Sequence, residues 1–181
     1  TSLYGRLLMR NAVSLLLLLV PAGIASAQGS PQEAVTRPNI LWIVGENFAL
    51  DLGCYGAPNV ETPNLDRLAG SGVRFTRVYS TSPVCAPSRS ALMTGWYATT
   101  TDMHNMRSHR DDDYRLPKGV RPITHLLADA GYHTANITHI GERVVGTGKL
   151  DLNFVNEGPV YAGKEWSKLK QKQPFFAQIN M

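Results

Sequence analysis

The sequence has little cysteine and little charge, and each shortage excludes a class of protein. Two cysteines in 181 residues cannot build a disulfide-stapled fold, and 16 glycines with 11 prolines are too few for a collagen-like chain. Without residues 1–27, which hold Arg6 and Arg10 and no acid, 16 basic side chains remain against 14 acidic ones. Because these two numbers are nearly equal, the charge gives no electrostatic basis for binding nucleic acid. The 43% of hydrophobic residues is ordinary for a folded domain.

Long apolar runs are also missing. The run Leu15–Val20, even extended to Ala12–Ala27, is shorter than the roughly 20 residues that span a bilayer. Two arginines precede this run and Ala25-Ser26-Ala27 ends it, a pattern typical of a secretory signal peptide cleaved after Ala27. Residues 28–36 then form a polar linker. We therefore expect a periplasmic or secreted protein without a stable membrane anchor.

Strand and helix patterns alternate along the rest of the chain, which predicts an α/β fold with a largely parallel sheet. The apolar run at 39–44 indicates a strand buried on both faces, and Thr62-Pro63 is typical of a helix start. The other predicted elements are strands at 73–79, 133–140 and 174–179 and helices at 88–94 and from Pro122 onward. Because the sequence stops within an apolar strand, we expect it to be a fragment of a larger domain or a truncated product.

Two loops at strand ends carry polar side chains, and ligand sites of open α/β sheets lie at the carboxyl ends of strands. Glu46 and Asn47 directly follow the first strand. Cys85 comes just before a predicted helix, whose start attracts anions, and Arg89 follows four residues later. These features predict a site for a tetrahedral oxyanion, phosphate or sulfate, with Cys85 as a thiolate nucleophile. Alternatively, Cys85 is a small buried hydrophobe or pairs with Cys54.

The segment Cys85-Ala86-Pro87-Ser88-Arg89 has the form C-x-P-S-R, and further blocks lie on both sides of it. These blocks are Arg37-Pro38-Asn39-Ile40-Leu41, residues 51–56, residues 62–69, residues 91–95 and Gly131-Tyr132-His133-Thr134. In this order they resemble the type I, formylglycine-dependent sulfatases of the alkaline phosphatase superfamily. The resemblance implies a parallel sheet sandwiched by helices, with residues 37–181 as the incomplete N-terminal part of the catalytic domain.

The resemblance also implies roles for the residues of both loops. In this family a maturation enzyme oxidises the signature cysteine, here Cys85, to formylglycine, and Arg89 would stabilise the modified residue. A divalent cation, usually calcium and alternatively magnesium, would bind Glu46, Asn47 and residue 85, since such ions prefer oxygen ligands. The family has Asp-Asp at the first two positions, so Asn47 lacks one charge. Its remaining ligands would lie past Met181.

A third segment, Gly148-Lys149-Leu150-Asp151, resembles the family's Gly-Lys-x-His. The resemblance implies that Lys149 contacts sulfate, while Asp151 replaces the histidine and is either a proton carrier or a solvated loop residue. His104 is a candidate substrate-binding residue or else a surface histidine. The run Asp111-Asp112-Asp113 is interpreted as a solvated turn rather than a metal site, because consecutive side chains face different directions.

Three functions remain open at this point. The first is a sulfuric ester hydrolase that acts on a sulfated small molecule or glycan and depends on the maturation enzyme as a partner. The second is a phosphate or phosphonate monoester hydrolase with the same chemistry, and the third is a non-catalytic, truncated chain. We expect these 181 residues by themselves to turn over little or no substrate, because half of the metal ligands would be missing.

Overall fold

The computed structural model describes residues 37–106 and 112–181, and all of them belong to one compact unit, Thr36–Met181. The predicted signal peptide (1–27) and linker (28–36) lie outside the described residues, as does Asp111. Within the part that is described, no helix is long and apolar enough to cross a membrane.

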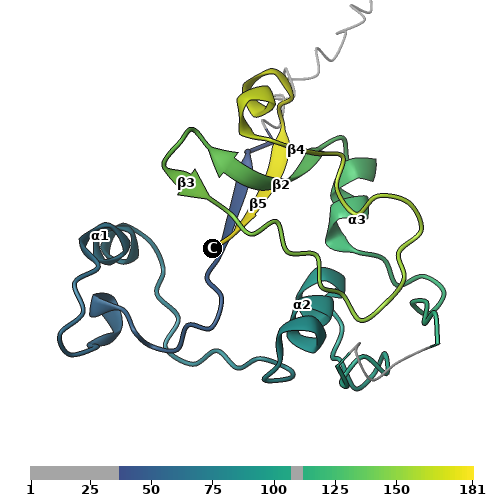
Figure 1. The fold of residues 1–181 in the computed structure, drawn as a ribbon, viewed down its shortest axis with the longest axis horizontal. Helices are drawn as coiled ribbons and strands as arrows, with labels where there is room; N and C mark the ends of the chain where they lie inside the picture. The colour runs from purple at the N-terminus through teal and green to yellow at the C-terminus, as the bar shows by residue number, and fades with distance from the viewer. Residues whose placement is uncertain (1–36, 107–111) are drawn as a thin grey trace, which may run out of the picture. The chain divides into compact units, whose positions relative to one another are not determined.

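A five-stranded, largely parallel sheet organises this unit (Figure 1). Its strands are β1 (Ile40–Val44), β2 (His133–Ile140), β3 (Val144–Val145), β4 (Gly163–Glu165) and β5 (Phe175–Asn180). β5 lies between β1 and β2 and is parallel to both, β4 is parallel to β2, and β3 is antiparallel to β2. The α/β fold predicted from the alternating patterns is confirmed, with β2 at its predicted bounds.

The helices follow the predicted positions with small shifts. They are α1 (Pro63–Ser71), α2 (Cys85–Thr94) and α3 (Ile123–Asp129), with 3-10 helices at Gly53–Tyr55 and Trp166–Gln171. α2 begins three residues earlier than predicted, because Val84 is extended and Pro87 falls in the first turn, where its missing N–H has no helical partner to lose. Gly95 ends the helix at φ 71°, a left-handed conformation that suits glycine.

Two apolar clusters hold α2 and the sheet. The first fixes α2 against two loops, and the second packs a 3-10 helix on one face of the sheet. The first comprises Ala91, Met93, Ala98, Met103, Leu152 and Phe154, and the second comprises Ala135, Ile137, Leu169, Ala177 and Ile179. The position of α2 at the site therefore depends on its own buried face as well as on polar contacts.

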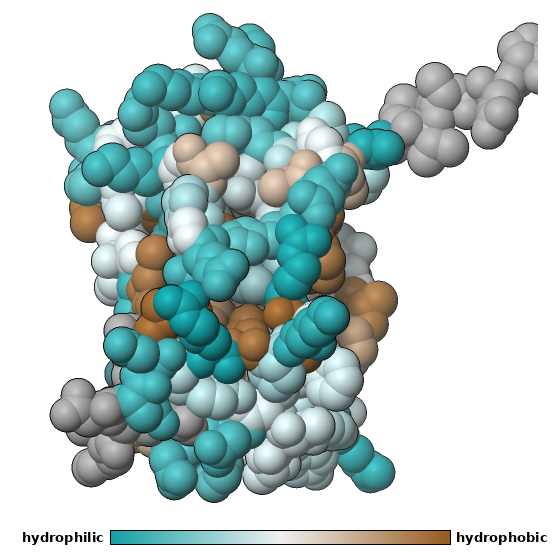
Figure 2. All heavy atoms as spheres, turned by 90° about the vertical axis from the view of Figure 1, so that its right-hand side faces the viewer, coloured by the Kyte–Doolittle hydropathy of each residue, from teal (hydrophilic) through white to brown (hydrophobic). Residues whose placement is uncertain are grey.

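Two predictions about strands are wrong. Residues 73–79 are extended but form no strand, and Val73 and Tyr79 are 81% and 85% exposed, because no described segment offers them a ladder partner. The strand at 39–44 is not buried on both faces, since Leu41 and Ile43 are exposed. β1 pairs with β5 alone, and no described segment covers the face that carries Leu41 and Ile43. Exposed apolar groups are also visible among polar ones in Figure 2.

Candidate active site

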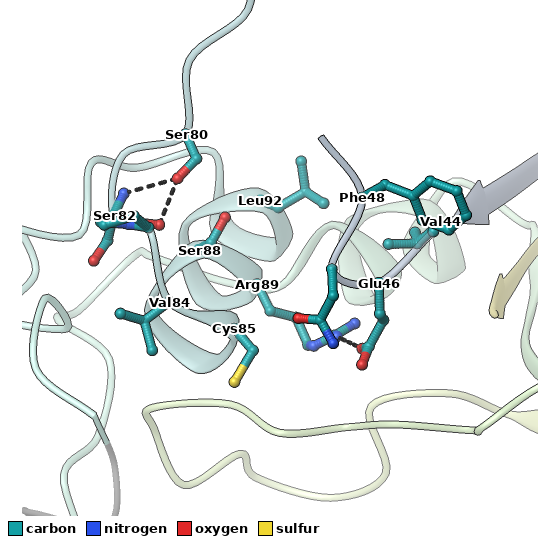
Figure 3. A pocket seen from close by; sticks show the side chains of 13 residues that line it. Val44, Glu46, Phe48, Ser80, Ser82, Val84, Cys85, Ser88, Arg89 and Leu92 are labelled. Carbon is teal, nitrogen blue, oxygen red and sulfur yellow. Dashed lines mark hydrogen bonds and ion pairs between the residues drawn. The ribbon is translucent and has the colours of Figure 1, made fainter. Parts of the chain in front are cut away.

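The loop that follows β1 and the first turns of α2 enclose a cavity of about 280 Å³ (Figure 3). The main chain of this loop is held to the end of β5: Met181 N donates to Val44 O at 2.9 Å, and Glu46 N donates to Met181 O at 3.0 Å. The cavity is lined by residues 44–48, Ser80, residues 82–85, Ser88, Arg89 and Leu92. The site therefore lies at the carboxyl ends of β1 and β5. This position was predicted for the loop after β1, whereas the loop before Cys85 was predicted to follow a strand at 73–79 that does not form.

α2 presents a thiol and a guanidinium on one face. Cys85 and Arg89 are four residues apart, so both point toward the cavity, where Cys85 is exposed and Arg89 is 8% exposed. Cys85 is the first helical residue rather than a residue before the helix, so its side chain lies at the positive end of the helix dipole. Both cysteines are free thiols, so a disulfide between Cys85 and Cys54 does not form.

Glu46 joins the two predicted cationic residues. Its Oε1 accepts a hydrogen bond from Arg89 Nη2, and its Oε2 accepts one from Lys149 Nζ at 3.1 Å. Burial would raise the pKa of Glu46, but the Lys149 hydrogen bond and the two positive charges outweigh it and hold the pKa below its usual 4.5. Glu46 is thus a carboxylate at neutral pH, and two cations share its single charge.

The loop that carries Lys149 approaches the sheet closely. Gly146 N donates to Thr138 O at 2.7 Å, and Thr147 N donates to Asn180 O at 2.8 Å. A Cβ at Gly146 would lie 2.7 Å from the carbonyl oxygen of Ile137, so this approach requires glycine. The contact between the loop and the strand ends brings Lys149 to Glu46.

Asp151, at the end of the same loop, lies beside the thiol. Cys85 Sγ lies 3.7 Å from Asp151 Oδ2, although 66 residues separate the two in the sequence. Sequence reasoning left Asp151 as a weak candidate. Its carboxylate adds a second negative charge to the cluster of Glu46, Arg89 and Lys149.

The remaining predicted residues lie in different places. Asn47 lines the cavity, is exposed, and has φ 56°, a conformation that asparagine tolerates. His104 is exposed, does not line this cavity, and lies 3.8 Å from Asp102. Asp112 and Asp113 are exposed. Among the described residues no group of three His, Cys, Asp or Glu side chains could hold a metal ion.

Sequence reasoning missed a set of buried amides behind the cavity. Asn180, at the end of β5, is fully buried and contacts Arg89, Gln178, Asn136 and the main chain of Lys149. Its only signal in the sequence was a polar residue at the end of an apolar strand. That signal does not distinguish a site residue from the end of a strand.

The oxygen atoms of the loop after β1 suit a hard divalent cation. Glu46 supplies an ionised carboxylate and Asn47 an amide oxygen, and both line the same cavity as Cys85. Calcium takes six to eight oxygen ligands, so these two residues fit as part of a ligand set and not as a complete one.

The Asp151→Asn variant tests the charge beside the thiol. We expect the ratio of the iodoacetate rate to the iodoacetamide rate at Cys85 to be about threefold higher in this variant than in the unaltered chain. In the unaltered chain the negative charge of Asp151, about 5 Å away, repels the anionic reagent. Peptide mass spectrometry of the alkylated chain measures this ratio at Cys85. The matched control is Asp129→Asn on α3, whose carboxylate pairs with Arg121. An unchanged ratio in Asp151→Asn would show that the two side chains are not in contact.

Taken together, the sheet topology and the site define a class. A largely parallel α/β sheet carries a cysteine, an arginine and a glutamate at one end of its strands, and this fold is shared with solved proteins. A solved structure of a 2-O GAG sulfatase superposes with a TM-score of 0.58 at 22% identity, over 80% of this chain and 35% of that one.

Sequence comparisons specify the family. The family model described as Sulfatase matches residues 38–158, and the chain belongs to the sulfatase family. It is 35% identical over 158 residues to an ulvan-active sulfatase of Formosa agariphila, covering 80% of this chain and 24% of that protein. It is 38% identical over 139 residues to the N-acetylgalactosamine-6-sulfatase of Canis lupus familiaris, covering 71% and 26%. The chain thus spans about a quarter of the length of these relatives.

Proposed function

We propose that the protein hydrolyses sulfate esters, with a sulfated glycan as the favoured substrate class and a sulfated small molecule as the alternative. The observation that carries this proposal is one cavity that combines an exposed cysteine at the start of α2 with Arg89 and Glu46, and Lys149 reaches this cavity through its hydrogen bond to Glu46. Family membership supports the reaction, and the names of the two curated relatives, one ulvan-active and one acting on N-acetylgalactosamine 6-sulfate, support a sulfated sugar.

Cys85 is proposed as the precursor of the nucleophile, with a formylglycine-generating enzyme as the partner that converts it. Once converted and hydrated, residue 85 would supply one hydroxyl that attacks sulfur and displaces the alcohol of the ester. The second hydroxyl would then lose its proton, and sulfate would leave as the C–O bond to it breaks and the aldehyde re-forms. The helix start and Arg89 would stabilise the negative charge that gathers at residue 85 during this attack.

Lys149 is proposed to bind the sulfate group. Its side chain is 32% exposed, so it can turn from Glu46 toward an anion in the cavity. Glu46 and Asp151 together balance the charges of Arg89 and Lys149, so attraction of the anionic ester depends on where the two cations lie and not on a net positive charge. His104 lies away from this cavity, so any role in substrate binding would require an extended substrate.

A divalent cation, calcium in the first place and magnesium as the alternative, is proposed at Glu46, Asn47 and residue 85. It would polarise the sulfate oxygens when bound. The chain's own residues supply an ionised carboxylate and an amide oxygen toward it, and Arg89 and Lys149 limit the negative charge there. A ligand set with a single carboxylate predicts weak affinity for the cation, and we therefore expect little turnover by these 181 residues alone.

The location of the protein is also a proposal. The composition of residues 1–27 favours export to the periplasm or the medium, with cleavage after Ala27. An exported protein would meet sulfated polysaccharides outside the cell, which agrees with the favoured substrate class. N-terminal sequencing of the mature protein tests the cleavage position.

The deciding experiment follows residue 85 and the reaction together. The gene is expressed in full in a host that contains the maturation enzyme, and the tryptic peptide with residue 85 is examined by mass spectrometry. We expect an aldehyde or its hydrate at residue 85, and aryl sulfate hydrolysis that exceeds aryl phosphate hydrolysis and stops with a chelator. An unmodified thiol at residue 85 together with no sulfatase activity would contradict the proposal. Faster hydrolysis of aryl phosphate than of aryl sulfate would favour the related phosphomonoesterase activity.

A further inference from the structure

Asn180 is fully buried behind the cavity and contacts both cationic residues. Its Oδ1 accepts a hydrogen bond from Arg89 Nη1 at 2.9 Å, and its Nδ2 donates to the main-chain oxygen of Lys149 at 3.2 Å. The orientation of the amide is unambiguous: arginine offers only donors and a main-chain oxygen only accepts, so the amide oxygen must face Arg89 and the amide nitrogen must face Lys149. One side chain therefore joins two segments that lie 60 residues apart.

Other buried amides hold Asn180 itself. Gln178 Nε2 donates to Asn180 Oδ1 at 2.9 Å, and Asn180 Nδ2 also donates to Asn136 Oδ1 at 3.4 Å. Asn136 in turn donates to the main-chain oxygen of Gly148 at 2.9 Å, beside Lys149. Gln178, Asn180 and Asn136 are each at most 6% exposed, so their hydrogen bonds have no competition from water.

The neutrality of Asn180 matters for charge. Arg89 and Lys149 are already balanced by two carboxylates, Glu46 and Asp151, and a third carboxylate in the place of Asn180 would make the cluster net negative. An amide anchors the guanidinium by its oxygen without removing its charge. Arg89 is thus fixed from one side by Glu46 and from the other by Asn180.

We propose that Asn180 is a positioning residue of this site: its amide fixes the guanidinium of Arg89 and the main chain of Lys149 together, so that both charges are held at Glu46, which lines the same cavity as residue 85. This inference rests on the proposed function in that the cavity receives an anionic ester. It assigns Asn180 no contact with substrate, and its effect passes through Arg89 and Lys149.

The test uses the chain from a host without the maturation enzyme, so that Cys85 remains a thiol. The thiolate attacks iodoacetate and iodoacetamide in the same way, and the two reagents are nearly the same size. The ratio of their rates at Cys85 therefore reports the local charge and does not depend on how exposed the thiol is. Peptide mass spectrometry gives this ratio separately at Cys85 and at Cys54, which lies in a 3-10 helix outside the cavity and serves as an internal reference.

Asn180→Ser is the main variant, because a hydroxyl cannot span both partners. At the dielectric constant of water, removing one full charge about 6 Å from the reagent changes the ratio about threefold. Loosening the two cations without removing them should therefore lower the ratio about 1.5- to 2-fold. Asn180→Leu, which keeps the branched shape but none of the hydrogen bonds, should do the same if the serine variant unfolds. The matched control is Asn153→Ser, a second buried amide that contacts neither Arg89 nor Lys149 and should leave the ratio unchanged.

The route of the effect is tested in a background of Arg89→Gln with Lys149→Gln. If Asn180 acts through these cations, Asn180→Ser has no further effect on the ratio there. An equal drop in both backgrounds, an unchanged ratio in the single variant, or an equal drop in Asn153→Ser would each overturn the proposal. None of these outcomes depends on sulfatase activity or on formylglycine, so the positioning role and the proposed function can fail separately.

Discussion

Cys85→Ser, in the gene expressed in full with the maturation enzyme, is expected to lose steady-state aryl sulfate hydrolysis by on the order of a thousandfold or more. A serine that the maturation enzyme leaves unconverted has one hydroxyl. If that hydroxyl attacked sulfur, the sulfated serine would have no second hydroxyl to expel sulfate, and turnover would stop. Stopped-flow measurement of the released phenol checks this, with at most one equivalent released per chain.

The matched control for this prediction is Cys54→Ser. Cys54 lies outside the cavity, and its main chain, rather than its thiol, bonds to Asp66 and Arg74. We expect its hydrolysis rate to remain near that of the unaltered protein. Repeated turnover by Cys85→Ser at a rate near normal would show that residue 85 is not the nucleophile.

Glu46→Leu is expected to lower the free energy of unfolding by about 2–3 kcal/mol at neutral pH, since it leaves the buried Arg89 guanidinium without its charged partner. Asn180 still accepts from that guanidinium, which limits the loss. Urea unfolding measures the difference. Because the folded pKa of Glu46 lies below 4.5, its contribution is complete above pH 4.5 and is lost as the pH falls through that lower value.

The comparison variant for Glu46 is Glu157→Leu. Glu157 pairs with Arg115 at 3.0 Å, but the two side chains are 86% and 60% exposed, so we expect a loss of less than about 0.5 kcal/mol. Equal losses in both variants, or a Glu46→Leu loss that persists unchanged at pH 3, would contradict the role of the Arg89–Glu46–Lys149 cluster in stability.

Local patterns predicted the elements that depend on local physics. The strand at 133–140 has its predicted bounds, and the helix begins at Pro63, where proline geometry favours a first helical residue. Thr62 is the N-cap residue as predicted, but its side chain makes no capping hydrogen bond. The pattern at 73–79 failed because alternation describes one chain segment, whereas a strand requires a neighbour. Burial of 39–44 failed for a related reason, since an apolar run does not state which faces are covered.

The site was predictable where one helix or one loop carries its residues. Cys85 with Arg89, and Glu46 with Asn47, are close in sequence and line one cavity. The carboxyl-end rule accounts for Glu46 and Asn47 after β1, but not for Cys85, because no strand forms at 73–79. The contacts of Asp151 with Cys85 and of Asn180 with Arg89 span 66 and 91 residues. Such pairs depend on how strands are ordered in the sheet, which periodicity does not encode.

The placement of Cys85 and Arg89 on successive turns of α2 has a mechanical consequence. A helix of ten residues packed against a buried cluster moves as a rigid rod, so the spacing between the two side-chain attachment points is constant whenever the surrounding loops shift. The helix itself therefore sets the spacing between the thiol and the guanidinium, and the loops at 45–48 and 147–151 do not.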